Sequence, residues 1–301
     1  MTRRDLLFSS LAASVNLGVG VGAASAPAAR FPSDPRARLA VASYPFRKFV
    51  NPATGTLPLL EFPKMVVERF GVHGIEPLDA HFPSTDPGYL EKFRAALDRA
   101  KAYVVNIPVG KLEASFYEPN PANRRIAVEK AKRWVDVAAA LGSPGIRAHI
   151  RETKAAAPNA NLAADALRQV AEYGAEKNIV IHLENDDPRS EEPFFLVDVI
   201  AKAGTPWLRA LPDFCNSMLL EKGEAFNDRA LEALFRRAYA ICHVKDSEQD
   251  GKKFYRIDLA KAFAIAKSAG YRGYFSMEYD ADGDPYAPTA SLIERSLKYL
   301  R

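Results

Sequence analysis

The chain has 301 residues, of which 48% are hydrophobic and 26% are charged, values close to the average for globular domains. This composition argues against a disordered chain and against a membrane bundle. The formal net charge is +4 and there is no long basic run, so nucleic acid is not expected as a partner. Two cysteines, Cys215 and Cys242, are expected to be buried thiols rather than a disulfide framework or a zinc site.

Residues 1–30 have the layout of an export signal followed by a short leader. A basic start precedes a weakly apolar segment, and small residues surround positions 24–26. Arg3 and Arg4 form a twin-arginine pair, which predicts export to the periplasm. An uncleaved membrane anchor is less favoured, because Asn16 and several glycines interrupt a segment that would need about 20 apolar residues. We therefore expect no stable membrane insertion after cleavage.

From residue 38 onward, short aliphatic segments alternate with longer amphipathic ones. The expected strands span residues 39–46, 73–78, 102–108, 145–150, 179–185, 208–214, 240–246 and 274–280. The expected helices include residues 89–102, 124–142, 162–178, 231–240 and 258–271. This alternation is typical of βα units around a parallel sheet.

Eight such units without an intervening linker predict one α/β domain over residues 31–301, a (β/α)8 TIM barrel. A doubly wound sheet is the alternative. That fold normally has a glycine-rich turn after its first strand, and the segment SYPFRKF at residues 43–49 contains no glycine.

Polar residues gather where the expected strands end, which is the catalytic face of a TIM barrel. Those residues are Glu76, His149, Glu184, Asp213, His243 and Glu278. Any one of them, taken alone, is more often a structural ion pair or a solvated side chain. Their recurrence on the last four strands favours a functional site.

Glu184, Asp213, His243 and Glu278 provide three carboxylates and one imidazole for this site. Such ligands suit one divalent cation, with Mn²⁺ or Mg²⁺ favoured by the carboxylates and Co²⁺ or Zn²⁺ also possible. Without a cation, the three carboxylates would repel one another. Mn²⁺ is the first choice.

The segments IVIHLEN, LPDFCN, ICHVKD and YFSMEYD, in this order, resemble the sugar phosphate isomerase/epimerase superfamily of xylose isomerase-like TIM barrels. The similarity extends over essentially the whole chain after the signal. It implies that Glu184, Asp213, His243 and Glu278 ligate one metal ion. It further implies that the two glutamates act as acid and base.

A metal-dependent isomerase or epimerase is the activity that these groups suggest, acting on a ketose or related polyol through a metal-stabilised enediolate. Positioned proton transfer by Glu184 and Glu278 would contribute about 10²- to 10⁴-fold. A lyase or dehydratase acting on a keto sugar, an inosose or a 3-keto glycoside is the alternative. Two further functions are less favoured. A nuclease of the endonuclease IV type has a histidine-rich metal site, and this chain has five histidines, few of them at strand ends. The other is a non-catalytic sugar-binding barrel.

Substrate binding is expected from Glu76, His81, Arg147, His149, Lys245 and Arg256. Lys245 would neutralise charge on a substrate oxygen or pair with Asp246 or Glu248, two readings that the sequence does not separate. Asn216 stands where the ketose epimerases commonly have a histidine, so the sugar is not specified. A homodimer or homotetramer is possible.

Overall fold

The computed structural model describes residues 26–281 and 283–301. The predicted export signal falls almost entirely on residues 1–25, outside the described residues. No helix within the described ranges is both long enough and apolar enough to cross a membrane. Cys215 and Cys242 are both buried and free, as expected.

Every predicted strand has a counterpart in the structure. The barrel strands are β1 (Leu39–Ala42), β2 (Gly74–Glu76), β3 (Tyr103–Val104), β4 (Ile107–Val109), β5 (Gly145–Ala148), β6 (Val180–Glu184), β7 (Leu208–Leu211), β8 (Ile241–Val244) and β11 (Tyr274–Met277). The expected third strand is thus split into β3 and β4, with Val105 and Asn106 between them.

The strands close into a ring of parallel neighbours. They pair in the orders β3-β2-β1-β11-β8 and β4-β5-β6-β7. The two groups join through the continuous chain from β3 to β4 and through isolated parallel bridges from Ala210 to Ala238 and from Asp213 to His243. This closure confirms the TIM barrel and excludes the doubly wound sheet.

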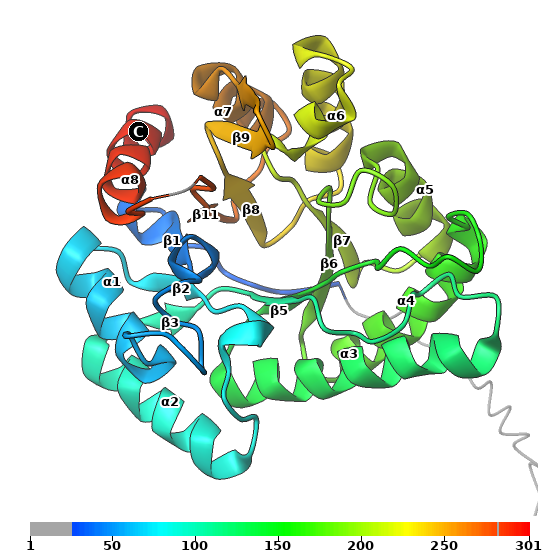
Figure 1. Cartoon of the computed structure of the whole chain (residues 1–301), viewed down its shortest axis with the longest axis horizontal. Helices are drawn as coiled ribbons and strands as arrows, with labels where there is room; N and C mark the ends of the chain where they lie inside the picture. Colours follow the sequence, from blue (N-terminus) through cyan, green and yellow to red (C-terminus); the bar gives the residue numbers. More distant parts are fainter. Residues whose placement is uncertain (1–25, 282) are drawn as a thin grey trace, which may run out of the picture.

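Helices surround the strands on all sides (Figure 1). They are α1 (Phe62–Phe70), α2 (Pro87–Ala100), α3 (Pro121–Leu141), α4 (Ala160–Glu176), α5 (Pro193–Ala203), α6 (Glu224–Phe235), α7 (Leu259–Ser268) and α8 (Tyr286–Leu300). Local signals set their ends: the Asn120 side chain accepts from the Ala122 amide at the start of α3, and Gly142 ends that helix at φ +70°. Helix α6 begins seven residues before the expected 231–240 segment, because Phe226 and Ala230 belong to its buried face.

Along β7 and β8, the side chains that point into the barrel change from apolar to polar toward the carboxyl end. Ala40, Val105, Leu211 and Ile241 form one buried cluster inside the ring. Leu211 and Ile241 each precede a candidate ligand by two residues, so successive inward side chains change from aliphatic to ionisable along the strand. The apolar layer therefore supports the polar groups at the carboxyl ends.

One element was not expected. After β8 the chain forms an antiparallel hairpin of β9 (Ser247–Asp250) and β10 (Lys253–Arg256). Asp250 and Gly251 begin its turn, with Gly251 at φ +59°. The hairpin matters to the site because Ser247 and Glu248 at its base are buried.

Candidate metal centre

The four candidate ligands come from adjacent strands at one end of the barrel. Glu184 is the last residue of β6, His243 lies in β8, Asp213 follows β7 and Glu278 follows β11. Each side chain offers one ligand atom, and these four atoms lie within 4.8 Å of one another. All four residues are buried, with at most 7% exposure. The structure thus brings together the complete set that the sequence predicted.

His243 stands at the centre of this group. Its Nδ1 lies 2.7 Å from Glu184 Oε1 and 3.1 Å from Glu278 Oε2. Backbone amides fix the Asp213 carboxylate, because its Oδ1 accepts hydrogen bonds from the amides of Cys215 and Asn216 at 2.8 and 2.7 Å. Its other oxygen, Oδ2, is buried without a hydrogen-bond partner. An unpartnered carboxylate oxygen beside two further carboxylates is suited to a cation.

The charges of the cluster also favour a cation. Burial raises the pKa of Asp213 to about 7, despite the nearby Lys245 ammonium, and burial also raises the pKa of Glu184. Burial acts in the same direction on Glu278, but His243 and Lys245 together lower its pKa to about 2. The existing positive charges thus do not offset the burial of these two carboxyl groups, and a further cation would favour their ionised forms. Three carboxylates and one imidazole therefore fit a divalent ion with oxygen preference.

Lys245 forms one of the two interactions that the sequence left open, an ion pair with a nearby carboxylate. Its Nζ lies 3.1 Å from Glu248 Oε2, 3.4 Å from Glu278 Oε2 and 3.8 Å from Asp213 Oδ2. It also donates to Asn216 Oδ1 at 3.0 Å. The predicted ion pair therefore forms with Glu248, brought in by the hairpin, and not with Asp246, which pairs with Arg295. Lys245 nevertheless lines the cavity described below.

Arg147 and His149 belong to a second acidic group beside the first. The Arg147 guanidinium contacts Asp186 Oδ2 at 2.7 Å and Glu191 Oε2 at 3.1 Å, and its Nε lies 3.2 Å from Glu184 Oε2. His149 Nδ1 lies 2.8 Å from Glu191 Oε2. Although His149, Asp186 and Glu191 have a spacing that suits a metal ion, the Arg147 guanidinium already pairs with both carboxylates. This arrangement does not favour the multi-metal site of an endonuclease IV-type nuclease.

A cavity of about 370 Å³ opens beside three of the four ligands, and the fully buried Asp213 does not line it. It is lined by Tyr44, Leu78, Pro108, Gly110, Arg147, His149, Glu184, Asp186, Asn216, Leu219, His243, Lys245, Glu248, Glu278 and Asp280. Sequence reasoning missed Tyr44, Asp186 and Asp280 as lining residues. Each follows a barrel strand by two or three residues, so extending the search a few positions past every strand end would have found them.

Three predicted substrate ligands do not line this cavity. Glu76 is fully buried behind His243. His81 is 4% exposed, its Nδ1 lies 2.8 Å from Ser43 Oγ, and burial with the nearby Lys111 and Arg47 lowers its pKa to about 4. Arg256 is exposed at the end of β10, with its guanidinium 5.1 Å from the Phe254 ring centroid.

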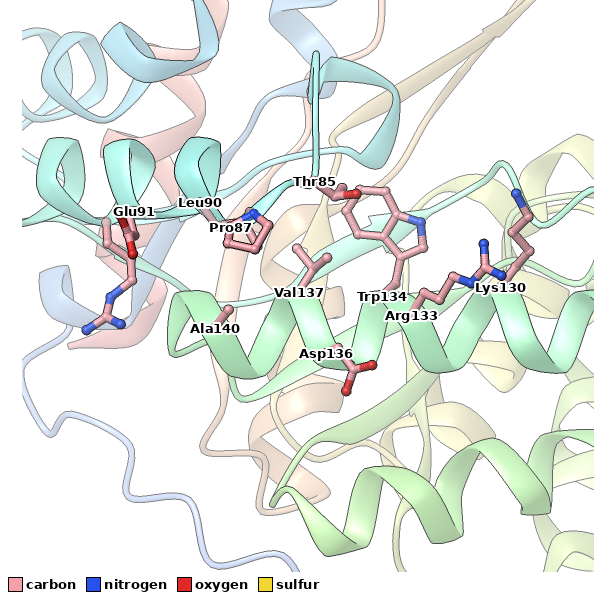
Figure 2. Close-up of a pocket in the computed structure, with 11 residues that line it drawn as sticks. Thr85, Pro87, Leu90, Glu91, Lys130, Arg133, Trp134, Asp136, Val137 and Ala140 are labelled. Atoms are coloured by element: carbon pink, nitrogen blue, oxygen red, sulfur yellow. The ribbon is translucent and has the colours of Figure 1, made fainter.

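A larger cavity, of about 650 Å³, lies on the outside of the barrel between α2 and α3. Figure 2 shows Val137 and Ala140 of α3 beneath Pro87 and Leu90 of α2, with the Trp134 ring rising from α3 beside Thr85. None of the four candidate ligands lines it. The largest volume and the converging ionisable groups therefore lie in different places, and the candidate site is defined by the ionisable groups.

The structure is thus a closed (β/α)8 TIM barrel with a buried carboxylate and histidine cluster at the carboxyl ends of its strands, and this cluster could hold a metal ion. Residues 66–301 match the family model described as xylose isomerase-like TIM barrel. The chain belongs to that family. No curated protein matches it significantly by sequence.

Solved structures share the fold. A xylose isomerase-like TIM barrel protein from Mycobacterium smegmatis in complex with magnesium has a TM-score of 0.70 at 17% identity, over 87% of this chain and 96% of the other. The 3-keto-D-glucoside 4-epimerase of E. coli has a TM-score of 0.64 at 17% identity, over 86% and 98%. A D-allulose 3-epimerase from Methylomonas sp., in complex with D-allulose, has a TM-score of 0.67 at 17% identity, over 89% and 97%. At such identities the likeness establishes the fold alone.

Proposed function

We propose that this protein is a divalent-metal-dependent isomerase or epimerase acting on an uncharged keto sugar or related polyol. The observation that carries the proposal is the convergence of ligand atoms from Glu184, Asp213, His243 and Glu278 to within 4.8 Å of one another, with Asp213 Oδ2 left without a hydrogen-bond partner. The magnesium complex and the sugar epimerases among the structural neighbours support it.

Glu184 and Glu278 are the acid and base in this proposal. When bound, a divalent ion supplies Lewis-acid polarisation of the substrate carbonyl. Glu184 Oε2 faces Arg147 and Glu278 Oε2 faces Lys245, so a cation holds each carboxylate in place. Both glutamates line the cavity, and one removes the proton next to the carbonyl while the other returns a proton to the substrate. Lys245, which lies beside Glu278, stabilises the negative charge that develops on the substrate oxygen.

The charges around the cavity support an uncharged sugar rather than a sugar phosphate. Among the described residues that line the cavity, the basic side chains of lysine or arginine are those of Arg147 and Lys245. Arg147 contacts three carboxylates, and so does Lys245. A phosphate would have to displace one of these pairs in a cavity that also presents Asp186 and Asp280.

The test uses purified protein incubated with D-allulose or a 3-keto-D-glucoside in deuterated buffer, with Mn²⁺ or Mg²⁺ added. We expect deuterium in an isomerised product. The variants Glu184→Gln and Glu278→Gln should lose about 10²- to 10⁴-fold in rate. Glu294→Gln is the control, because Glu294 is a surface residue paired with Arg36.

Loss of water or of the aglycone from the substrate would support the lyase or dehydratase instead. A parent protein that binds no divalent ion in a direct titration would contradict the mechanism. A protein that binds the ion and the sugar without any proton exchange would indicate a sugar-binding barrel. A product formed only from the phosphorylated sugar would contradict the proposed substrate class.

We also propose that the chain is exported through a twin-arginine pathway and acts in the periplasm. The Arg3–Arg4 pair and the small residues at 24–26 support this location. Replacing both arginines with lysine should retain the protein in the cytoplasmic fraction, measured by cell fractionation. Unchanged distribution of the variant would contradict the proposal.

A further inference from the structure

A row of buried polar side chains crosses the barrel behind the candidate ligands. Glu76, the last residue of β2, has no exposed surface and does not line the cavity. Both of its carboxylate oxygens lie 3.0 Å from Nε2 of His243. The carboxylate thus contacts the ring nitrogen that points away from the other ligands.

The two nitrogens of His243 therefore face different partners. Nδ1 faces Glu184 and Glu278, while Nε2 faces Glu76 alone. Carboxylate oxygens accept hydrogen bonds, so Nε2–H donates to Glu76. Nδ1 lies 2.7 Å from Glu184 Oε1 and donates to it in the same way, so a cation would replace that proton on the side where Glu184, Asp213 and Glu278 converge. Metal-binding histidines are commonly oriented in this way by a carboxylate on the other ring nitrogen.

We infer that Glu76 is a positioning residue that orients His243 for metal binding, and not a substrate ligand as its place at a strand end had suggested. The inference rests on the metal site of the proposed function. It assigns Glu76 to the metal centre through His243, since no oxygen of Glu76 reaches the cavity.

Glu76 is itself held in place. Asn106, in the break between β3 and β4, donates from Nδ2 to Glu76 Oε1 at 2.8 Å. The Asn106 Oδ1 lies 3.1 Å from Nδ1 of His182 on β6. An amide oxygen only accepts hydrogen bonds, so Nδ1 of His182 donates to Asn106. The direction of each hydrogen bond in the row is therefore determined, from His182 through Asn106 to the carboxylate.

Because it is buried next to His243, the Glu76 carboxylate also compensates positive charge on the imidazole. Two features of the geometry indicate that it orients the ring in addition. The Nε2 atom is equidistant from both Glu76 oxygens, so rotation of the imidazole would break two contacts together. Asn106 in turn fixes the carboxylate against rotation. A surface counter-ion would need neither restraint.

The experiment measures metal affinity and the protonation of the ring nitrogens in the full-length protein. Mn²⁺ is titrated into metal-free parent, Glu76→Gln, Glu76→Asp and Asp79→Asn. Asp79 is a matched control, because it is a buried carboxylate near the end of β2 that binds the Gly110 and Lys111 amides. We expect about 10- to 100-fold weaker binding for Glu76→Gln, a smaller loss for Glu76→Asp and parental affinity for Asp79→Asn.

Protein loaded with Mg²⁺ and labelled with ¹⁵N-histidine provides the second readout. In the parent, Nε2 of His243 should carry a proton and Nδ1 should not. In Glu76→Gln the Nε2–H resonance should shift and its exchange with water should become faster. A general loss of packing would not change this single resonance selectively.

Parental metal affinity in Glu76→Gln, together with an unshifted Nε2–H resonance, would overturn the inference. A Mg²⁺-loaded parent that keeps a proton on Nδ1 would also overturn it, and this measurement remains decisive even if Glu76→Gln does not fold. If the parent binds no divalent ion, the proposed function fails. The response of Nε2–H to Glu76→Gln in metal-free protein then decides the orienting role separately.

Discussion

At the scale of single residues, Lys245 shows how one side chain serves both the fold and the site. Its ammonium is buried among Asp213, Glu248 and Glu278, and these carboxylates raise its pKa well above the usual value although burial opposes them. In the proposed enzyme a divalent ion shares two of these three carboxylates. Lys245 therefore matters most to stability when no ion is bound.

Lys245→Met should destabilise the metal-free protein by about 3–5 kcal/mol, because it leaves buried carboxylates without their cation. The loss should be smaller with saturating Mn²⁺, since the ion neutralises Asp213 and Glu278. Urea unfolding with and without Mn²⁺ measures both values. Lys253→Met, which removes only an exposed pair with Glu221, is the control. Equal destabilisation in the two conditions would contradict the shared neutralisation.

His81 makes an acid-sensitive contribution to stability. Burial, with Lys111 and Arg47 nearby, lowers its pKa from 6.5 to about 4. In the unfolded chain His81 is protonated below about pH 6.5, whereas in the folded protein it stays neutral down to about pH 4. The free energy of unfolding therefore falls as the pH decreases through this window. The effect is about 2 kcal/mol at pH 5. In His81→Gln, the free energy of unfolding measured with a denaturant should fall less steeply between pH 7 and 4 than in the parent. An unchanged slope would show that His81 does not cause the decline.

At the scale of elements, contacts between neighbouring strands restrict residues that look unimportant in the sequence. Gly145 begins β5 beside β6, and a Cβ at this position would lie 2.5 Å from His182 Cε1 and 2.7 Å from the Val180 carbonyl oxygen. The β5–β6 spacing therefore depends on the absence of a side chain. The same absence leaves room for His182, the first member of the row that ends at His243.

Gly145→Ala should destabilise the protein by about 1–3 kcal/mol, because strand or ring must shift to relieve the clash. It should also weaken metal binding if displacement of His182 reaches Asn106 and Glu76. Gly88→Ala is the control, since nothing lies within 4 Å of a Cβ there. Thermal unfolding and Mn²⁺ titration check both expectations. A Gly145→Ala protein as stable as the control would contradict the close packing.

At the scale of the whole molecule, the segment before β1 covers the amino-terminal end of the barrel. The Tyr239 hydroxyl donates to the Pro27 carbonyl at 2.8 Å and accepts from the Ala29 amide at 2.7 Å. Phe31 packs edge-on against Tyr239 and Tyr274, with centroids 5.5 and 5.7 Å apart. Part of the predicted leader at residues 1–30 thus packs on the barrel.

A chain that begins at Pro32 should be about 1–3 kcal/mol less stable than one that begins at Pro27, because it loses two aromatic pairs and both Tyr239 hydrogen bonds. Thermal unfolding of the two chains measures the difference. The chain from Pro27 should match the full-length protein. Equal stability of all three chains would show that the segment does not support the barrel.

Much of the architecture was accessible from the sequence because its signals are local. Alternating hydrophobic periods identified the strands and the fold, and polar residues at strand ends identified Glu184, Asp213, His243 and Glu278. The β9–β10 hairpin was missed although Asp250 and Gly251 are a turn signal, because its strands are short and polar. Because the hairpin was not predicted, the sequence could not show that Lys245 pairs with Glu248 instead of Asp246.

The sequence by itself determined the barrel and the four residues that converge in it, since strand periodicity and position along a strand specify which side chains point inward at the carboxyl end. Only the tertiary structure decided what those residues contact. Glu76 and His243 are 167 positions apart, and Arg147 reaches Asp186 and Glu191 across neighbouring strands. Such pairs form because ring closure brings distant strands side by side, and no local pattern encodes the separation or orientation of two side chains across a closed sheet.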